Sequence, residues 1–317
     1  MALILLNLLP WLPQGAASAE TVPWVRYSLF EGGSEIDHDG QGVSIDTPFA
    51  IASVGKTMTS VAVLRMAERG TLSVDDPVSD WVTADISRGL GGLQTTSLRH
   101  LLTMTSGLPD YYIETFLEDA LDDPDNVQTP QSALRYVYDT PRHFPPGADF
   151  EYSNTNYVLL GLILENATGR SYAEVLQQEV FAPAQMAQSF VFGDRDLPRS
   201  FAKSPDHTED VRAYYQGAGF GDGGVISTAR DLARFYSALF LDRSLLERAM
   251  MDALMTDPLG AAYGMGLEVE DGLVGHSGGD LGFSSDVRLD LETGALAIEL
   301  VAAEDAKTGW TFDQMPE

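Results

Sequence analysis

One segment of the 317-residue sequence is too apolar around its circumference to lie on a protein surface. From Ser53 to Arg69 the spacing predicts a helix, which Gly70 ends. Its apolar residues, which point to most sides, are Val54, Met58, Val61, Ala62, Leu64 and Met66. A helix of this kind belongs in the interior, because several of its faces would otherwise meet water. With 44% apolar residues, the chain can supply one large core or two modest cores that share a cleft.

Extended segments are expected near both ends of the chain. Near the start, Trp24 to Phe30 is rich in aromatic and β-branched residues and stops at the turn Gly32-Gly33, and a second extended piece is expected around Gly42 to Ile45. Near the end, short extended runs are separated by glycine-bearing turns. These runs are Tyr263 to Val269, Leu273 to His276, Phe283 to Leu291 and Leu296 to Val301. They are typical of an antiparallel sheet.

The middle of the chain is predicted to be mostly helical. Its clearest helices are Asn156 to Ala167, with Gly169 as a stop signal, and Thr228 to Leu241. We therefore predict an α+β fold, with an antiparallel sheet flanked by helices and an inserted, mostly helical domain. The sheet domain is expected to comprise residues 20–73 and 260–317, and the helical domain residues 74–259, with the active site at their interface.

The first nineteen residues are predicted to be a signal peptide. Leu3 to Leu12 is a short apolar run, and Ala17-Ser18-Ala19 has the small-x-small pattern of a signal-peptidase site. The basic residue that usually precedes such a run is missing, and the first basic residue is Arg26. After Glu20 no segment is apolar enough to cross a bilayer. The sequence therefore predicts an exported protein, periplasmic or secreted, without an integral membrane segment once the signal is removed.

Charge and cysteine content exclude several classes of function. The chain has 47 acidic and 19 basic residues, a formal charge of −28, which repels nucleic acid and anionic membranes. It has no cysteine, so disulfides, thiolate catalysis and Cys-ligated metals are excluded. The five histidines show no metal-ligand spacing. We therefore expect no nucleic-acid partner, no metal and no other cofactor.

Ser53-Val54-Gly55-Lys56 at the opening of the apolar helix has the spacing of an activated nucleophile. Residues three apart lie on one face of a helix, so the amine can reach the hydroxyl. A lysine partly removed from water has a lowered pKa and can take the serine proton. The bland alternative is a capping serine beside a lysine that extends to solvent. Ser200 and Lys203 repeat the spacing, but they lie between prolines with no helical pattern after them.

A second candidate group is Tyr152-Ser153-Asn154, which precedes the helix expected from Asn156. A phenol beside a cationic lysine can ionise near neutral pH and take the serine proton, and the Asn154 amide can orient the lysine or a substrate carbonyl. Alone, the tripeptide is equally typical of a core tyrosine and a helix cap.

Gly275-His276-Ser277-Gly278-Gly279 lies at the end of a predicted strand and also spells G-x-S-x-G. This is the nucleophile elbow of α/β-hydrolases, in which Ser277 would be the nucleophile and an acid and a histidine would follow it. No histidine follows Ser277. The alternative is a strand lining the cleft, where the N–H groups of Gly279 and Ser53 would form an oxyanion hole.

Together these three elements resemble the β-lactamase and penicillin-binding superfamily, whose signature is S-x-x-K, then Y-x-N, then K-T-G or H-x-G. Further stretches are similar to its branch of class C β-lactamases, soluble D-alanyl-D-alanine carboxypeptidases and family VIII esterases. They are Thr105 to Leu108, Tyr152 to Asn156, Gly223 to Thr228 with Asp231-Leu232, Tyr263 to Gly266, and Gly275 to Ser285. The similarity extends over roughly Phe49 to Val301.

The resemblance implies a β-lactamase/transpeptidase-like fold and an acyl-enzyme route. Ser53 would be the nucleophile, and Lys56 and Tyr152 the proton-transfer pair. The substrate-binding positions would be Asn154, His276 in the place usually held by lysine, Ser277 and Gly279. The family also covers one sheet face with helices from both chain ends, and little of this chain lies before Trp24 or after Lys307 to supply them.

Two departures from the family pattern bear on the substrate. In the similar carboxypeptidases an arginine and a threonine hold the terminal carboxylate of the peptide, and this chain has Glu268 and Gly279 in those places. An acid repels a carboxylate. We therefore expect an esterase-like enzyme that cleaves small-molecule esters or amides. Two alternatives stay open, namely a D-alanyl-D-alanine carboxypeptidase or β-lactamase acting on peptidoglycan-like substrates, and a catalytically retired penicillin-binding or sensor module.

Overall fold

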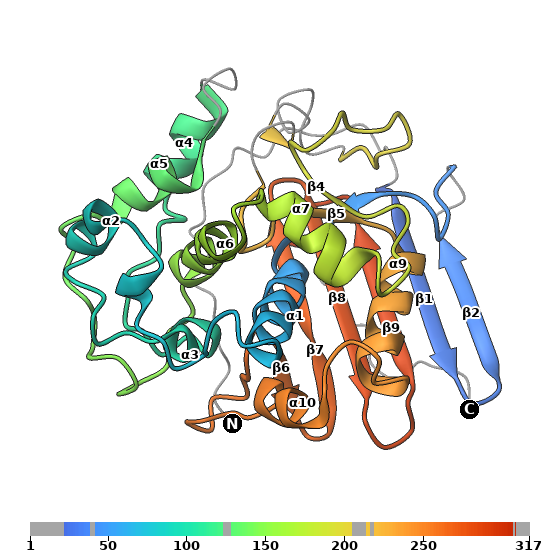
Figure 1. The fold of residues 1–317 in the computed structure, drawn as a ribbon. Coiled ribbons are helices and arrows are strands. Elements are labelled where there is room, and N and C mark those ends of the chain that lie inside the picture. Colours follow the sequence, from blue (N-terminus) through green and yellow to red (C-terminus); the bar gives the residue numbers. More distant parts are fainter. Residues whose placement is uncertain are drawn as a thin grey trace.

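A six-stranded antiparallel sheet forms one side of the protein in its computed structural model (Figure 1). The structure describes residues 22–38, 42–122, 128–204, 214–215, 219–306 and 308, so the predicted signal peptide lies outside the described residues. The strand order is β2-β1-β9-β8-β7-β6. The strands are β1 (Trp24–Phe30), β2 (Gly33–His38), β6 (Glu268–Glu270), β7 (Leu273–Asp280), β8 (Phe283–Asp290) and β9 (Leu296–Val301). The sheet thus joins the first strands of the chain to the last.

A small three-stranded sheet in the order β3-β5-β4 leads into the segment that carries Ser53. Its strands are β3 (Phe49–Ala50), β4 (Phe190–Val191) and β5 (Val225–Ser227). The chain leaves β3, passes through a 3₁₀ turn, η1 (Ala52–Val54), and enters helix α1 (Gly55–Glu68). Helix α1 is buried over nearly its whole circumference, as its sequence predicts.

Some of the other helices pack directly against α1, and others lie farther away. Helix α6 (Asn154–Thr168) packs against α1 and α3, and α9 (Ala229–Tyr236) packs against β1 and β9. The remaining α-helices are α2 (Ala84–Gly89), α3 (Leu98–Leu102), α4 (Glu114–Asp122), α5 (Pro130–Leu134), α7 (Tyr172–Leu176) and α10 (Arg248–Leu254). Short 3₁₀ segments at Val78–Asp80 and Arg135–Val137 and π-helical segments at Gln177–Phe181 and Ser237–Leu241 complete the helical structure. Figure 1 shows α2 to α5 on the side of α6 away from β2.

The α+β prediction is confirmed, with an antiparallel sheet, flanking helices and a helical insertion. Strand β1 has the predicted limits, and the helix predicted from Asn156 begins two residues earlier, at Asn154. Strand β2 was not predicted. The division into residues 20–73 with 260–317 and residues 74–259 stays a prediction. Helix α9, which falls in the second part by sequence, lies against strands of the first.

Two predicted extended segments are wrong. The piece around Gly42 to Ile45 ends in a turn, in which the Thr47 N–H donates to Ser44 O (2.9 Å) and the Ser44 N–H to Thr47 Oγ1 (2.8 Å). The run Tyr263 to Val269 forms a strand only from Glu268, because its glycines bend the chain against α10. A Cβ at Gly264 would lie 2.3 Å from the carbonyl oxygen of Leu254, and Gly266 has a φ of +68°.

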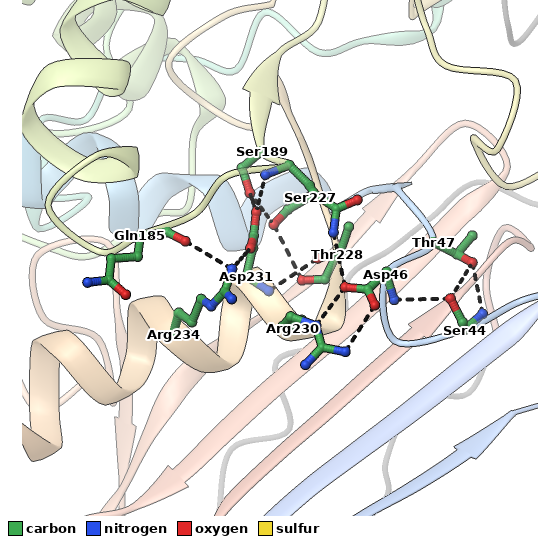
Figure 2. Close-up of polar contacts among 11 residues, drawn as sticks. Ser44, Asp46, Thr47, Gln185, Ser189, Ser227, Thr228, Arg230, Asp231 and Arg234 are labelled. Carbon is green, nitrogen blue, oxygen red and sulfur yellow. Dashed lines mark hydrogen bonds and ion pairs between the residues drawn. The ribbon is translucent and has the colours of Figure 1, made fainter.

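A polar network ties the segment before β3 to helix α9 (Figure 2). Arg230 makes a two-point ion pair with Asp46, with N–O distances of 2.6 and 2.9 Å, and this contact lowers the pKa of Asp46. Asp231 is buried, and its carboxylate accepts from Ser189 Oγ (3.0 Å) and from Arg234 Nη1 (3.0 Å). The network fixes the segment that leads into β3, the strand before Ser53.

Candidate active site

Ser53 lies on a sharp turn between β3 and α1. Ala52 has a φ of +46°, a left-handed conformation that a residue with a side chain adopts only where the surroundings impose it. Two hydrogen bonds hold the turn, one from the Ile51 N–H to Val225 O (3.1 Å) and one from Ser285 Oγ to Ile51 O (2.8 Å). The strands β5 and β8 therefore position Ser53, which is partly exposed and accessible to a substrate.

Lys56, the second residue of α1 and three residues after Ser53, is fully buried against Ser53. Its Nζ atom lies 3.0 Å from Ser53 Oγ, 2.7 Å from Asn154 Oδ1 and 2.5 Å from the carbonyl oxygen of Asp222. A neutral amine has two N–H donors and one lone pair. With the donors on Asn154 and Asp222, the lone pair faces the hydroxyl of Ser53.

Burial lowers the pKa of Lys56 from 10.5 to about 8, although the carboxylates of Asp222, Asp110 and Asp280 oppose this shift. An ordinary surface lysine is almost fully protonated at neutral pH. A lysine with a pKa of about 8 has a substantial neutral fraction within the physiological range. The geometry and the pKa of Lys56 thus both suit a proton acceptor for Ser53.

Tyr152 contacts both members of this pair. Its ring lies 5.0 Å from Lys56 Nζ, and its side chain shares a hydrogen bond with Ser53. Burial raises the pKa of Tyr152 well above 10, and the hydrogen bond with Ser53 only partly offsets that shift. The phenol is therefore protonated at neutral pH. This direction is opposite to the ionisation that the sequence analysis expects of a phenolate base.

Asn154 joins Lys56 to a carboxylate that the sequence analysis missed. Its Oδ1 accepts from Lys56, while its Nδ2 donates to Asp110 Oδ2 (3.0 Å) and its backbone N–H to Asp110 Oδ1 (3.1 Å). Asp222, also missed, accepts a 2.7 Å hydrogen bond from the hydroxyl of Tyr111. Asp110 lies two positions after the Thr105 to Leu108 stretch, which is the one signal in the sequence that could have found it.

Strand β7 lies against the Ser53 turn through Gly278. A Cβ at this position would approach Ser53 N to 3.1 Å and Ile51 O to 2.6 Å, so only glycine allows the strand to come this close. Gly279 follows and is exposed. Ser277 is also exposed, and its hydroxyl and its N–H donate to Glu268 Oε1 at 2.8 and 3.1 Å. The hydroxyl of Ser277 is thus hydrogen-bonded to Glu268, the first residue of β6.

His276 is buried and its hydrogen bonds define its protonation. Nδ1 lies 2.5 Å from the carbonyl oxygen of Ser277 and therefore carries a proton, and Nε2 lies 3.0 Å from the hydroxyl of Tyr263. Burial lowers the pKa of His276, so the imidazole is neutral at neutral pH. The position where the resemblance places a lysine is therefore uncharged.

Glu268 lies beside Ser277, and its negative charge is partly neutralised by an ion pair with Arg288. Arg288 Nη2 lies 2.6 Å from Glu268 Oε2 and also contacts Asp286, at 3.1 Å. Burial acts to raise the pKa of Glu268, but the neighbouring His276, the charge of Arg288 and the two hydrogen bonds from Ser277 together lower that pKa. The residue is ionised, and part of its charge is neutralised by Arg288.

Two further properties bear on ligands and membranes. Within the described ranges, no three His, Asp or Glu side chains are grouped so that they could hold a metal ion, and the expectation of no metal or cofactor stays a prediction. Among the helices that the structure describes, none combines the length and the apolar character needed to span a bilayer.

Comparison with known proteins gives a consistent result. The family model named Beta-lactamase matches residues 24–307. Penicillin-binding protein 4* of Bacillus subtilis is 29% identical over 292 residues, which are 80% of this chain and 62% of that protein, so this chain spans less than two thirds of its relative's length.

Two solved structures are similar over most of the chain. A D-stereospecific amidohydrolase from Streptomyces sp. has a TM-score of 0.77 at 25% identity and covers 89% of both chains. A penicillin binding protein from Bacillus halodurans has a TM-score of 0.77 at 26% identity and covers 89% of this chain and 91% of its own.

Proposed function

This chain belongs to the beta-lactamase family, and we propose that it is a serine hydrolase that cleaves ester or amide bonds through an acylated Ser53. One observation carries the proposal: the buried Lys56 Nζ lies 3.0 Å from Ser53 Oγ. The fold around this pair is similar to that of an amidohydrolase and of a penicillin-binding protein. Packing alone does not require a buried lysine amine beside a serine hydroxyl that faces solvent. An activated nucleophile requires both groups, the exposed hydroxyl that attacks and the amine that takes its proton.

The proposed reaction starts with neutral Lys56 removing the proton of Ser53 Oγ. The oxygen attacks the substrate's carbonyl carbon, and the resulting oxyanion is stabilised by the N–H groups of Ser53 and Gly279. Protonated Lys56 returns the proton to the leaving alcohol or amine as its bond to carbon breaks. Water then attacks the acyl carbon while Lys56 takes a proton from it. The bond between Ser53 Oγ and the acyl carbon breaks, protonated Lys56 returns the proton to Ser53 Oγ, and the acid product leaves.

Tyr152 serves this scheme as a neutral hydrogen-bond donor. Its phenol keeps its proton at neutral pH, and its side chain shares a hydrogen bond with Ser53. A protonated phenol in this position can donate to the Ser53 oxygen as negative charge develops on it, or to the leaving group. Asn154 holds Lys56 in place. Ser277 is exposed on β7 and available to a substrate, whereas His276 lies buried beside Tyr152 and Tyr263.

The charges around the nucleophile favour a substrate without a carboxylate near the scissile bond. Asp110, Asp222 and Asp280 all lie close enough to Lys56 to influence its pKa, and His276 provides no positive charge. Glu268 adds a further acid, whose effect Arg288 reduces. A terminal carboxylate meets net repulsion here, so we propose an esterase-like enzyme acting on neutral esters or amides.

The second candidate is a D-alanyl-D-alanine carboxypeptidase or β-lactamase. The likeness to penicillin-binding proteins supports it, as does the ion pair of Glu268 with Arg288, which weakens the repulsion of a carboxylate. Comparing the kcat/KM for p-nitrophenyl butyrate, nitrocefin and a D-Ala-D-Ala peptide separates the candidates. A clear preference for the peptide would overturn the esterase assignment.

A labelling experiment tests the nucleophile itself. A fluorescent phosphonate should label the wild type and S277A, and should leave S53A unlabelled. Peptide mapping should place the label on Ser53. A label at Ser277 would replace the mechanism with the elbow alternative, and an unlabelled wild type would favour a catalytically retired module.

We also propose that the protein is exported, on the basis of the apolar run Leu3 to Leu12 and the cleavage pattern at Ala17-Ser18-Ala19. Mass spectrometry of protein recovered from outside the cytoplasm should give a chain that begins at Glu20. Intact chains recovered only from the cytoplasm would contradict export.

A further inference from the structure

We infer that Asp110 is a positioning residue, which fixes the orientation of the Asn154 amide and thereby holds Lys56 Nζ against Ser53. The inference rests on the proposed function, because it assigns a role to a residue that touches neither the nucleophile nor the substrate.

Three hydrogen bonds orient the carboxylate of Asp110 towards Asn154 and Tyr112. Its Oδ1 accepts from the backbone N–H groups of Asn154 and Tyr112, both at 3.1 Å, and its Oδ2 accepts from Asn154 Nδ2 at 3.0 Å. A carboxylate accepts hydrogen bonds and donates none. The amide nitrogen of Asn154 must therefore face Asp110, and its oxygen must face the other way, towards Lys56 Nζ at 2.7 Å.

The loop that carries Asp110 is itself held by hydrogen bonds on both sides of this residue. Thr155 Oγ1 and Ser153 Oγ donate to the carbonyl oxygen of Pro109, at 2.7 and 3.3 Å, and Thr155 Oγ1 accepts from the Tyr111 N–H at 3.0 Å. The start of α6 thus holds the loop on both sides of Asp110. A negative charge at the amino end of this fifteen-residue helix is also favoured by the helix dipole.

Lys56 needs two hydrogen-bond acceptors in fixed positions if its lone pair is to face Ser53. The charged or titratable groups that face it are Asp222 from the loop before β5, Asp280 and His276 from β7, Tyr152 and Tyr157 near the start of α6, and Asp110 itself. Its N–H donors are held by Asn154 Oδ1 and by the carbonyl oxygen of Asp222. If the Asn154 amide turned over, an NH₂ group would face the amine and one of these acceptors would be lost. The lone pair would then no longer be directed at Ser53.

Replacing Asp110 with Asn tests this role with little change in size. The single carboxamide oxygen cannot serve both the backbone N–H groups and the Asn154 amide, so Lys56 loses its fixed orientation. We expect kcat to fall by about 10- to 100-fold with KM changed by less than about 3-fold, as for loss of an oriented reacting group. Loss of the Asp110 charge should also lower the pKa of Lys56, so the acid limb of kcat/KM against pH should move to lower pH. A merely structural residue would not move that limb.

A double-mutant cycle shows whether Asp110 acts through Asn154. The measured quantity is the rate at which a phosphonate labels Ser53 in the wild type, D110N, N154A and D110N/N154A. The rates are compared at a pH above the pKa of Lys56, where the amine is neutral in all four proteins and the charge of Asp110 no longer changes its neutral fraction. Under that condition D110N should change the rate by less than about 2-fold in the N154A background, because the two residues act as one unit. An equal effect of D110N in both backgrounds would overturn the inference. D75N is the control, because Asp75 is a surface carboxylate paired with Arg99 at 2.8 Å, and it should label at the wild-type rate.

The effect of Asp110 on the pKa of Lys56 can also be measured by NMR, without an activity assay. The sequence has only three lysines, so the ¹³Cε signal of Lys56 can be followed by NMR in an S53A background. The titration midpoint of Lys56 should be lower in S53A/D110N than in S53A, and an unchanged midpoint would contradict the charge argument. If the wild type is not labelled at Ser53, the proposed function fails and the inference fails with it. If Ser53 is labelled but the cycle is additive, only the role of Asp110 is overturned.

Discussion

The hydroxyl of Tyr112 donates a 2.7 Å hydrogen bond to the carboxylate of Asp280, and so joins the loop before α4 to the end of β7. Asp280 follows Gly278 and Gly279, the part of β7 that lies against Ser53. The same carboxylate oxygen also accepts from the Leu281 N–H at 2.8 Å. This phenol and carboxylate therefore connect the helical side of the site to its sheet side.

Replacing Tyr112 with Phe should destabilise the protein. The change leaves a partly buried carboxylate with one donor fewer, which costs about 1–3 kcal/mol in the free energy of unfolding. Urea unfolding of the variant measures this loss. The matched control is Tyr136→Phe, because the hydroxyl of Tyr136 donates to Asp119 at an exposed site. It should change stability by less than about 0.5 kcal/mol. Equal losses of stability in the two variants would show that the hydrogen bond between Tyr112 and Asp280 contributes no more than the exposed one between Tyr136 and Asp119.

Replacing Lys56 with Ala should abolish most of the activity. The variant removes the group that accepts the Ser53 proton, and loss of such a group lowers kcat by about 100- to 10,000-fold. The rate of Ser53 labelling is the measurement. Lys203→Ala is the matched control, since Ser200 and Lys203 repeat the spacing on an exposed loop. A Lys56→Ala protein that labels as fast as the Lys203→Ala protein would eliminate lysine as the base.

The pH dependence of kcat/KM should follow the protonation of Lys56. Its pKa is lowered to about 8, and only the neutral amine can accept a proton. Activity should therefore rise with pH and level off above about 8. Burial raises the pKa of Tyr152 well above 10, so ionisation of the phenol should not lower activity between pH 8 and 10. A profile that is flat from pH 6 to 9 would assign the proton transfer to another group.

Replacing Glu268 with Gln should change substrate preference rather than overall chemistry. The substitution removes a negative charge beside Ser277 and leaves Arg288 without its main partner. A substrate with a terminal carboxylate should then be attracted instead of repelled. The ratio of kcat/KM for a D-Ala-D-Ala peptide to that for p-nitrophenyl butyrate should increase by about 10-fold or more, which is about 1.4 kcal/mol. A constant ratio would show that Glu268 does not determine the response to carboxylates.

The parts of the site that the sequence could predict depend on local geometry. Ser53 and Lys56 are three residues apart at the opening of a helix, and helical periodicity alone places them on one face. The strands and the buried helix are likewise predictable, because each has its own periodicity. Strand β2 lacks such a pattern, since all six of its residues are exposed.

The parts that the sequence could not predict depend on contacts between distant segments. Asp110 is 44 positions from Asn154, and Asp222 is 166 positions from the lysine that its carbonyl oxygen binds. Neither has a periodic pattern around it. The protonation of Tyr152 was missed for a related reason, because burial of the phenol depends on the packing of Tyr263 and His276 around it.

Among the strands that the structure describes, β2 lies at one edge of the sheet, and its sequence limits which strand could pair with it there. Two copies of the protein meeting edge to edge in antiparallel fashion about Ile36 would place Glu35 of each copy opposite Asp37 of the other. Like charges directly opposite each other destabilise such a pair. The charges of β2 therefore disfavour the pairing of two copies through this strand.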